Sequence, residues 1–156
     1  MDPLFRIREL GPGDIDGVMA IEAVSFPSPW SAGMFREEIG RDFSDALVAV
    51  GEPGSDVIGY AVCWTVAGES HLLNIAVRPD GRCRGVGAAL LKECIRRSAA
   101  AGARRIHLEV RPGNGSALRL YGRHGFVFRG IRKGYYTDTM EDAVLLAREI
   151  RGDDAI

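Results

Sequence analysis

The sequence predicts an α/β fold built on a single mixed, mostly antiparallel sheet of about seven strands, with about four helices on both faces. Segments typical of strands alternate with segments whose apolar residues recur at helical spacing, in the order β-α-α-β-β-β-α-β-α-β-β. A chain of 156 residues, 46% of them hydrophobic, has the size and composition of one domain. We expect residues 1–150 to form that domain and residues 151–156 to form an acidic, frayed tail.

The N-terminal part predicts one strand and two helices. Residues 5–10 alternate as a strand does and end at a turn rich in glycine and proline. Asp14 can cap a helix, because apolar residues follow it at helical spacing. The prolines of Phe26-Pro27-Ser28-Pro29-Trp30 must end that helix, and Ser31 can cap a second one that runs to about Ile39.

The rest of the chain predicts six further strands and two helices. The longest helix runs from Gly85 to about Ala101 and another from Asn114 to His124, each ended by the glycine that follows it. The expected strands are residues 46–50, 57–66, 72–77, 105–111, 126–131 and 143–148. We expect a polar connection that carries tyrosines between the last two strands.

Composition and charge exclude several classes of protein. No apolar run approaches the roughly 18 residues of a membrane-spanning helix, and the apolar content with a net charge of −1 excludes a disordered chain. Because the chain has 20 basic and 21 acidic residues, no overall positive field attracts nucleic acid or a membrane. The three cysteines, Cys63, Cys83 and Cys94, are odd in number and lack metal-ligand spacing. This pattern favours a reduced, cytoplasmic protein without a bound metal.

The most informative stretch is a glycine-rich turn between a strand and the longest helix, within residues 74–91. The free N–H groups and the dipole of a helix N-terminus form an anion site. Gly85 and Gly87 let a ligand touch the backbone, and Arg82 and Arg84 add charged donors. Dinucleotide and Walker motifs both fail here, since the residues they require do not follow the glycines. A turn with solvated arginines is the alternative, but strand, arginines and helix together favour a site for a phosphate ester.

The segment Arg82-Cys83-Arg84-Gly85-Val86-Gly87 matches the Gln/Arg-x-x-Gly-x-Gly/Ala signature of the GNAT superfamily, the Gcn5-related N-acetyltransferases, which this chain resembles. The likeness runs from about residue 4 to residue 149 and is densest in residues 73–91, 108–114, 117–121 and 130–136. Within the superfamily, the chain is similar to the ribosomal protein alanine N-acetyltransferases of the RimI type. The resemblance implies the GNAT fold, whose sheet is splayed between two central strands, here 72–78 and 105–111, with acetyl-CoA bound between them.

The resemblance also implies the acetyl-CoA contacts. The backbone of Ile75, Ala76 and Val77 would pair with the pantetheine arm. The pyrophosphate would lie on the loop formed by Arg82, Cys83, Arg84, Gly85, Val86, Gly87 and Ala88. Asn114 and Tyr121 would contact the cofactor further along, and Arg78 is a further candidate for the outer phosphate.

Two residues match the catalytic positions of the family. Glu109 matches the general base, and it shares one strand face with His107 and Arg111, which indicates either a wet cleft or a solvated face. Tyr121 matches the general acid, because a phenol with a pKa of about 10 can protonate a departing thiolate. Tyr121 also shares a helical face with apolar residues, so a role in the core is compatible with a hydroxyl that points into the cleft.

Other nucleophilic and basic side chains are expected to play lesser parts. Cys83 has no histidine nearby in sequence, and the family transfers acetyl groups directly, so we do not expect a nucleophile there. Flanking arginines and a helix N-terminus favour its thiolate, so bulky oxidation at Cys83 would block cofactor entry. His71, His107 and His124 are expected to be structural or exposed.

The cost of deprotonating an amine narrows the choice between the possible acceptor amines. An α-amine has a pKa about 2.5 units below that of lysine, a difference of about 3.4 kcal/mol, so a single glutamate more easily serves a chain terminus. Phe26, Trp30, Tyr135 and Tyr136 resemble the acceptor-side segments of the family, although ordinary packing explains them equally. Ser28-Pro29 lengthens the expected Phe-Pro-Trp pattern, which puts the shape of the acceptor pocket in question.

These observations favour an acetyl-CoA-dependent α-acetyltransferase that acts on an N-terminal alanine of a small-subunit ribosomal protein. The alternatives are transfer to a lysine or a small amine such as a polyamine or antibiotic, and a catalytically silent acyl-CoA sensor. Retention of both Glu109 and Tyr121 argues against the sensor, which needs neither. The partners expected are acetyl-CoA and a protein N-terminus, without nucleic acid or membrane, for a monomer or weak dimer in the cytoplasm.

Overall fold

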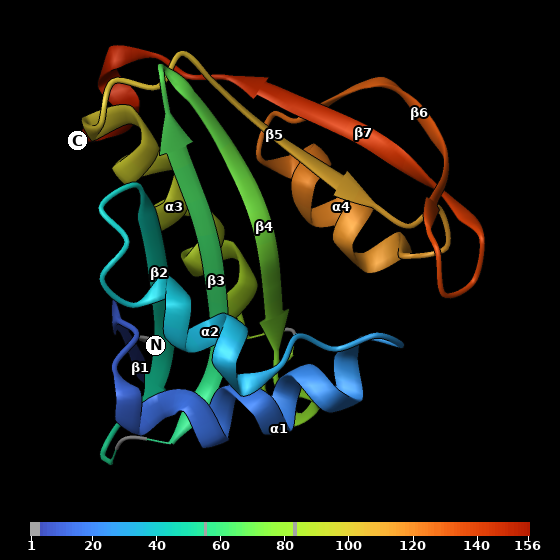
Figure 1. Ribbon diagram of the computed structural model, residues 1–156. Helices are drawn as coiled ribbons and strands as arrows, with labels where there is room; N and C mark the ends of the chain where they lie inside the picture. The colour runs from blue at the N-terminus through green and yellow to red at the C-terminus, as the bar shows by residue number, and fades with distance from the viewer. Residues whose placement is uncertain (1–3, 55, 83) are drawn as a thin grey trace.

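The computed structural model describes residues 4–54, 56–82 and 84–156. Within them, seven strands form one sheet in the order β1-β2-β3-β4-β5-β7-β6 (Figure 1). The strands are β1 (Phe5–Glu9), β2 (Ser44–Gly51), β3 (Val57–Val66), β4 (Glu69–Val77), β5 (Arg105–Val110), β6 (Val127–Tyr136) and β7 (Glu141–Glu149). β4 and β5 are parallel, and every other neighbouring pair is antiparallel. The predicted mixed, mostly antiparallel sheet is confirmed.

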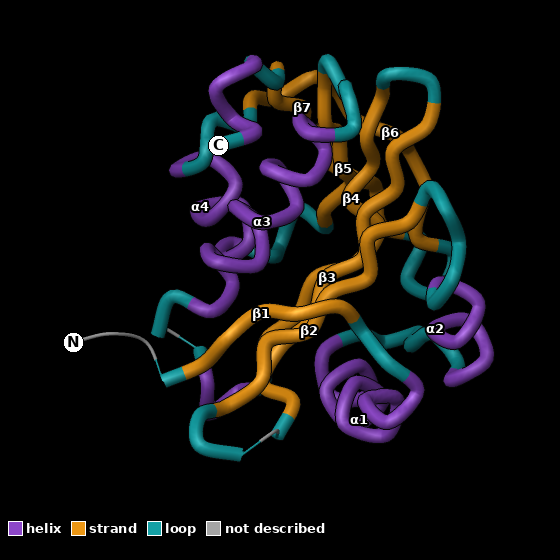
Figure 2. The backbone as a smooth tube through the Cα atoms, turned by 90° about the vertical axis from the view of Figure 1, so that its left-hand side faces the viewer, coloured by secondary structure: helices purple, strands orange, loops and turns teal. Residues whose placement is uncertain are grey.

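The helices divide between the two faces of this sheet (Figure 2). They are α1 (Ile15–Ser25), α2 (Ala32–Glu38), α3 (Val86–Ala100) and α4 (Gly115–Arg123). Alternation along β2 builds a core on each face: Leu47 packs with α3 and α4, whereas Val48 packs with α1 and α2. None of the helices in the described residues is long and apolar enough to cross a membrane.

The two central strands lie side by side only at their beginnings. Glu69–His71 of β4 pairs with Arg105–His107 of β5, and beyond these residues the strands diverge (Figure 1). A bulge in β4 lies just past the pairing, where Leu73 is an extra residue relative to the register of β3. The sheet is therefore splayed at its centre, as the resemblance implied.

The C-terminal hairpin differs from the prediction. The polar connection expected between the last two strands is largely part of β6, which continues to Tyr136, so that residues 137–140 alone join it to β7. Register shifts interrupt this pairing, and Gly134 adopts a left-handed φ of 62° within one of them. Alternation could not reveal the strand, because β6 is an edge strand with mostly exposed residues.

The last residues also differ from the frayed tail that we expected. Gly152–Ala155 form a short 3-10 helix, η3. The Arg148 guanidinium donates two hydrogen bonds to the Asp154 carboxylate, at 2.9 and 3.1 Å. A bidentate pair of this kind is stronger than a single hydrogen bond, and it attaches the tail to β7.

Candidate active site

A glutamate and two histidines meet where β4 and β5 diverge. Glu109, the predicted general base, lies on β5 two residues beyond His107, where the pairing with β4 ends. His71 Nε2 and Glu109 Oε2 are hydrogen-bonded at 2.6 Å, and the His71 ring stacks on His107 with centroids 4.5 Å apart. His71, which we expected to be structural or exposed, therefore fixes the Glu109 carboxylate from the opposite strand.

The surroundings of Glu109 favour its ionised form. Burial, the largest single effect, raises the pKa of this carboxyl, but the hydrogen bond and charge of His71, together with the charges of His107 and Arg132, leave the pKa below its ordinary value. Burial also lowers the pKa of His107, and the neighbouring His71 lowers it further. Glu109 is thus a carboxylate at neutral pH and is able to accept a proton.

Tyr135 and Tyr136 lie near this carboxylate, and Tyr121 lies near Tyr136. Burial, followed by the charge of Glu109, raises the pKa of Tyr135, and burial raises the pKa of Tyr136 to about 12. Tyr121, the predicted general acid, exposes 5% of its surface and packs against Phe126 with ring centroids 5.6 Å apart. Burial raises the pKa of Tyr121, and the nearby Tyr136 raises it further. The Tyr121 hydroxyl has no hydrogen-bond partner among the described residues, so a packed ring carries a free donor.

We use the name cofactor side for the segments predicted to bind the cofactor: the end of β4, residues 78–82, 84 and 85 of the turn, and the start of α3. These segments expose backbone donors. In the described chain, residues 75–77 have no strand partner on the side that faces β5. Gly85 precedes α3 with a left-handed φ of 80°, and no side chain caps it. The first helical bond joins the Ala89 N–H to the Gly85 carbonyl at 3.0 Å, so the preceding N–H groups of α3 lack helical partners.

The arginines of the turn differ in their availability. Arg82 and Arg84 are exposed, and Arg82 Nε donates to the Val77 carbonyl at 3.1 Å. Arg78 Nε lies 2.6 Å from Asp80 Oδ1, so this candidate for an outer phosphate is engaged in a local ion pair. The exposed guanidiniums flank the free N–H groups of α3, which is the arrangement that an anion requires.

The other residues predicted to bind the cofactor have mainly backbone groups available for it. The Val86 side chain is buried in the core, so its N–H alone is available, whereas Gly87 and Ala88 are partly exposed. Asn114 Oδ1 accepts a hydrogen bond from the Ala117 N–H at 3.3 Å and caps α4, as predicted for either of its roles. Cys83 lies outside the described residues.

The acceptor side, as we call the loop 26–30 with the turn of the β6–β7 hairpin, is joined by polar contacts. Phe26 and Trp30 are half-buried, and Ser28 Oγ donates to Asp138 Oδ2 of the hairpin at 3.0 Å. Arg111 at the end of β5 also donates to Asp138, at 2.9 Å, and its guanidinium lies 3.9 Å from the centroid of the Tyr136 ring. The residue that lengthens the expected Phe-Pro-Trp pattern therefore contacts the hairpin.

Sequence reasoning missed three residues that organise the site. His71 and Arg111 carry no local signal, because their partners lie on other strands. Glu22, by contrast, falls on the buried face of α1 together with Val18 and Ile21. A carboxylate on an apolar helix face indicates a buried polar network, and this signal was available in the sequence.

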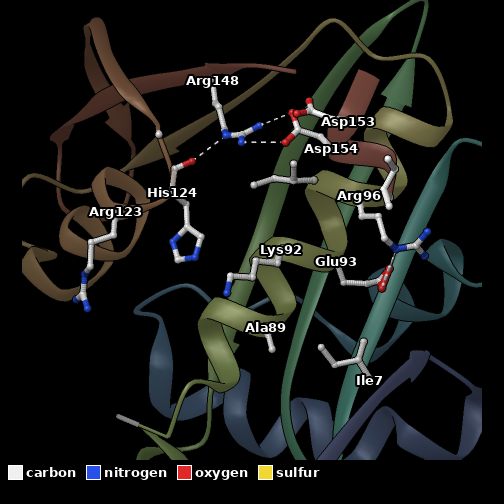
Figure 3. Close-up of a pocket in the computed structure, with 13 residues that line it drawn as sticks. Ile7, Ala89, Lys92, Glu93, Arg96, Arg123, His124, Arg148, Asp153 and Asp154 are labelled. Atoms are coloured by element: carbon white, nitrogen blue, oxygen red, sulfur yellow. Dashed lines mark hydrogen bonds and ion pairs between the residues drawn. The ribbon is translucent and has the colours of Figure 1, made fainter. Parts of the chain in front are cut away.

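A surface cavity of about 790 Å³ lies away from these residues, between α3, the end of α4 and η3 (Figure 3). Lys92, His124 and Asp154 are among the residues that line it, and none of the residues predicted to bind or react does. Among the described residues, no group of three or more His, Cys, Asp or Glu side chains is placed to hold a metal ion.

Comparisons with known proteins agree with the resemblance drawn from the glycine-rich turn. The model of the Acetyltransferase (GNAT) family matches residues 15–126. A [ribosomal protein bS18]-alanine N-acetyltransferase of Escherichia coli (strain K12) is 33% identical over 92% of this chain and 97% of its own. A relative from Bacillus subtilis (strain 168), whose name assigns it provisionally to the same activity, is 37% identical over 90% of this chain and 92% of its own.

Solved structures give the same result. The crystal structure of the ribosomal-protein-S18-alanine N-acetyltransferase from Escherichia coli superimposes with a TM-score of 0.83 at 32% identity, covering 94% of both chains. Ard1 from Thermoplasma volcanium superimposes with a TM-score of 0.84 at 26% identity, covering 95% of this chain and 99% of that one.

Proposed function

The chain belongs to the GNAT family of acetyltransferases and is an N-acetyltransferase, and we propose that it moves an acetyl group from acetyl-CoA to the α-amine of a protein that begins with alanine. The names of its relatives support a ribosomal acceptor of the bS18 type. The observation that carries the proposal is the Glu109 carboxylate, held by His71 where β4 leaves β5 and flanked by the tyrosines of β6.

Acetyl-CoA fits the cofactor side. Free N–H groups at the start of α3, with Arg82 and Arg84 beside them, suit a pyrophosphate. An added Cβ at Gly87 would meet its nearest neighbour at 3.5 Å, an ordinary contact, so packing does not require a glycine there. The unpaired backbone of residues 75–77 can hydrogen-bond an extended pantetheine arm. When bound, acetyl-CoA supplies the activated acetyl thioester.

The roles of Glu109 and Tyr121 follow from the proton balance of the reaction. The amine nitrogen forms a bond to the acetyl carbon, the carbon–sulfur bond breaks, and the amine loses one proton while the leaving sulfur gains one. Glu109 is ionised and accepts the amine proton, directly or through one water. The pKa of Tyr121 is raised by burial, so its hydroxyl keeps the proton that the thiolate requires.

The acceptor side suits the first residues of a peptide. Tyr135 and Tyr136 lie near the Glu109 carboxylate, and Phe26 and Trp30 add half-buried aromatic rings in the loop that contacts the hairpin through Ser28. An α-amine also costs about 3.4 kcal/mol less to deprotonate than a lysine at the same pH, which matters for a base with a lowered pKa. A cytoplasmic location accords with a ribosomal acceptor and with the free thiols of Cys63 and Cys94.

The test mixes the protein with acetyl-CoA and two short peptides and measures their masses. One peptide begins with a free alanine and contains no lysine, and the other has a blocked N-terminus and one internal lysine. We expect only the first peptide to gain an acetyl group. Acetylation of the lysine peptide would replace this proposal by a broader protein acetyltransferase. If neither peptide gains mass while acetyl-CoA binds, small amines and the sensor function remain as alternatives.

A further inference from the structure

A buried carboxylate outside the reaction centre connects the two sides of the site. Glu22 of α1 exposes 1% of its surface. Its Oε1 accepts hydrogen bonds from the Tyr60 hydroxyl and from Asn74 Nδ2, the latter at 2.9 Å, and its Oε2 accepts one from the Trp30 N–H at 2.9 Å. All three donors are uncharged groups. Burying a carboxylate is costly, and an apolar residue of similar volume would often be at least as stable.

The donors belong to parts of the molecule that must be aligned for transfer. Asn74 follows Leu73, the extra residue of the bulge at which β4 leaves β5. Trp30 ends the loop 26–30 of the acceptor side, and its ring packs on Phe35 with centroids 5.0 Å apart. One carboxylate therefore hydrogen-bonds both to the cofactor strand and to the backbone of the acceptor loop.

A second buried glutamate, Glu38, has a purely structural role and can be compared with Glu22. Glu38 exposes 4% of its surface and accepts a hydrogen bond from Trp64 Nε1 at 2.7 Å. It is also paired with a cation, since Arg41 lies 2.9 Å from its Oε1. Its partners do not touch the acceptor loop. Glu22 differs in two ways: no cation among the described residues is paired with it, and it accepts a hydrogen bond from a loop backbone.

We propose that Glu22 is a positioning residue for the acceptor: by holding the Trp30 backbone to the strand that follows the bulge, it fixes where the acceptor's first residue lies relative to the acetyl donor. This inference rests on the proposed function, because it takes the loop 26–30 as part of the acceptor site. Glu22 does not touch the reacting atoms, so its loss changes acceptor binding more than the binding of acetyl-CoA.

Four variants test this role. Glu22→Ala removes the loop anchor, whereas Glu22→Gln can rebuild it. A glutamine oxygen accepts from the Trp30 N–H, and its NH2 group donates to the Tyr60 hydroxyl and to the Asn74 carboxamide oxygen once both groups have rotated. Tyr60→Phe removes one hydrogen bond to the same carboxylate without touching the loop and is the matched control. Glu22→Asp keeps the charge but shortens its reach by one methylene, and it carries the test if the alanine variant does not fold.

The measurements are the KM of the alanine peptide and the Kd of acetyl-CoA. We expect Glu22→Ala, or Glu22→Asp in its place, to raise the peptide KM about tenfold and to change the acetyl-CoA Kd less than about twofold. Glu22→Gln should restore most of the KM, and Tyr60→Phe should leave it unchanged. A Tyr60→Phe variant with the same KM increase, or an acetyl-CoA Kd that rises as far as the KM, would overturn the proposal in favour of a structural network.

A second readout keeps this inference separate from the proposed function. The chain has two tryptophans, so Trp64→Phe leaves Trp30 as the single tryptophan, whose fluorescence can be excited selectively at long wavelength. In that background we expect acrylamide to quench Trp30 more strongly after Glu22→Ala or Glu22→Asp than after Tyr60→Phe, whatever amine the enzyme acetylates. Equal quenching would overturn the positioning role even if the alanine peptide is acetylated. Increased quenching without peptide acetylation would overturn the acceptor assignment alone.

Discussion

The hydrogen bonds that hold each side of the site differ in how far apart in sequence their partners lie. On the cofactor side, the hydrogen bonds of Arg82 and of the start of α3 are local: Arg82 donates to Val77, five positions away, and the Ala89 N–H donates to the Gly85 carbonyl. On the acceptor side they are distant, since Ser28 and Asp138 are 110 positions apart in sequence. A local turn forms wherever its own residues allow it, whereas a distant contact requires the whole sheet and both helical layers in place.

This difference predicts that substitutions on the two sides of the site have different effects on binding. A change at Arg82 or at the start of α3 should alter acetyl-CoA binding alone, because the hydrogen bonds described there stay within residues 77–89. A change on the acceptor side should spread, because Asp138 accepts a hydrogen bond from Arg111 and the Trp30 N–H donates one to Glu22, so each side chain or backbone group depends on another part of the chain. Effects from opposite sides should add when the two variants are combined.

The largest effect is expected at the residue that lies between the sides. Glu109→Gln should reduce turnover near neutral pH by about 10²-fold or more, because glutamine cannot accept the amine proton. Acetyl-CoA affinity should stay unchanged, as measured by isothermal titration calorimetry. A variant that turns over at the wild-type rate would place the base elsewhere.

A negative charge introduced at the start of α3 should weaken the binding of acetyl-CoA without lowering the stability of the fold. Gly87→Asp places a carboxylate among the free N–H groups, which the helix dipole favours, but it repels a pyrophosphate. We expect acetyl-CoA affinity to fall by about tenfold or more, which corresponds to about 1.4 kcal/mol, with the melting temperature retained.

Gly87→Ala is the matched control for this variant. An added methyl group would meet Val77 and Leu120 at 3.6 and 3.5 Å, so it fits without a shift, and affinity should be kept. Equal affinities for the aspartate and alanine variants would contradict the phosphate site on α3.

Tyr121 tests whether a packed residue also takes part in the reaction. Tyr121→Phe keeps the ring against Phe126 and removes a hydroxyl that has no partner among the described residues, so stability should change by less than about 1 kcal/mol. The rate of transfer should fall by about tenfold or more if the hydroxyl protonates the thiolate. Denaturant unfolding and single-turnover rates measure the two effects. A normal rate, or an unfolded protein, would leave Tyr121 with the core role alone.

The hydrogen bond that crosses between β4 and β5 gives a pH test. His71 lowers the pKa of Glu109, so replacing it by glutamine should raise that pKa relative to the wild type. A base with a higher pKa becomes protonated at a higher pH, so the acid limb of kcat/KM should move upward while activity above it is retained. The pH profile of the variant measures this. A downward shift, or none, would show that His71 does not stabilise the carboxylate.

The same contrast explains what could be predicted from the sequence. The turn at 78–85 and the start of α3 were predictable, because glycine, arginine and a following helix specify an anion site within a few residues. The strands were predictable from alternation, except for the end of β6, whose exposed edge carries none, and the start of β4, which begins at Glu69 rather than at the predicted residue 72. The partners of Glu22 and Arg111 were not, because each comes from a different element and no pattern in one segment reveals the other.

The smallest effect is expected at the contact that closes the acceptor side. Ser28→Ala removes one exposed hydrogen bond to Asp138, so the KM for the alanine peptide should rise about twofold with the acetyl-CoA Kd unchanged. Asp138→Ala should have the larger effect, since Asp138 also binds Arg111 at 2.9 Å. In a double-mutant cycle, Ser28→Ala should then cost nothing further in the Asp138→Ala background. An unchanged cost there would mean that Ser28 acts on the acceptor by itself, and that loop and hairpin are not coupled through this bond.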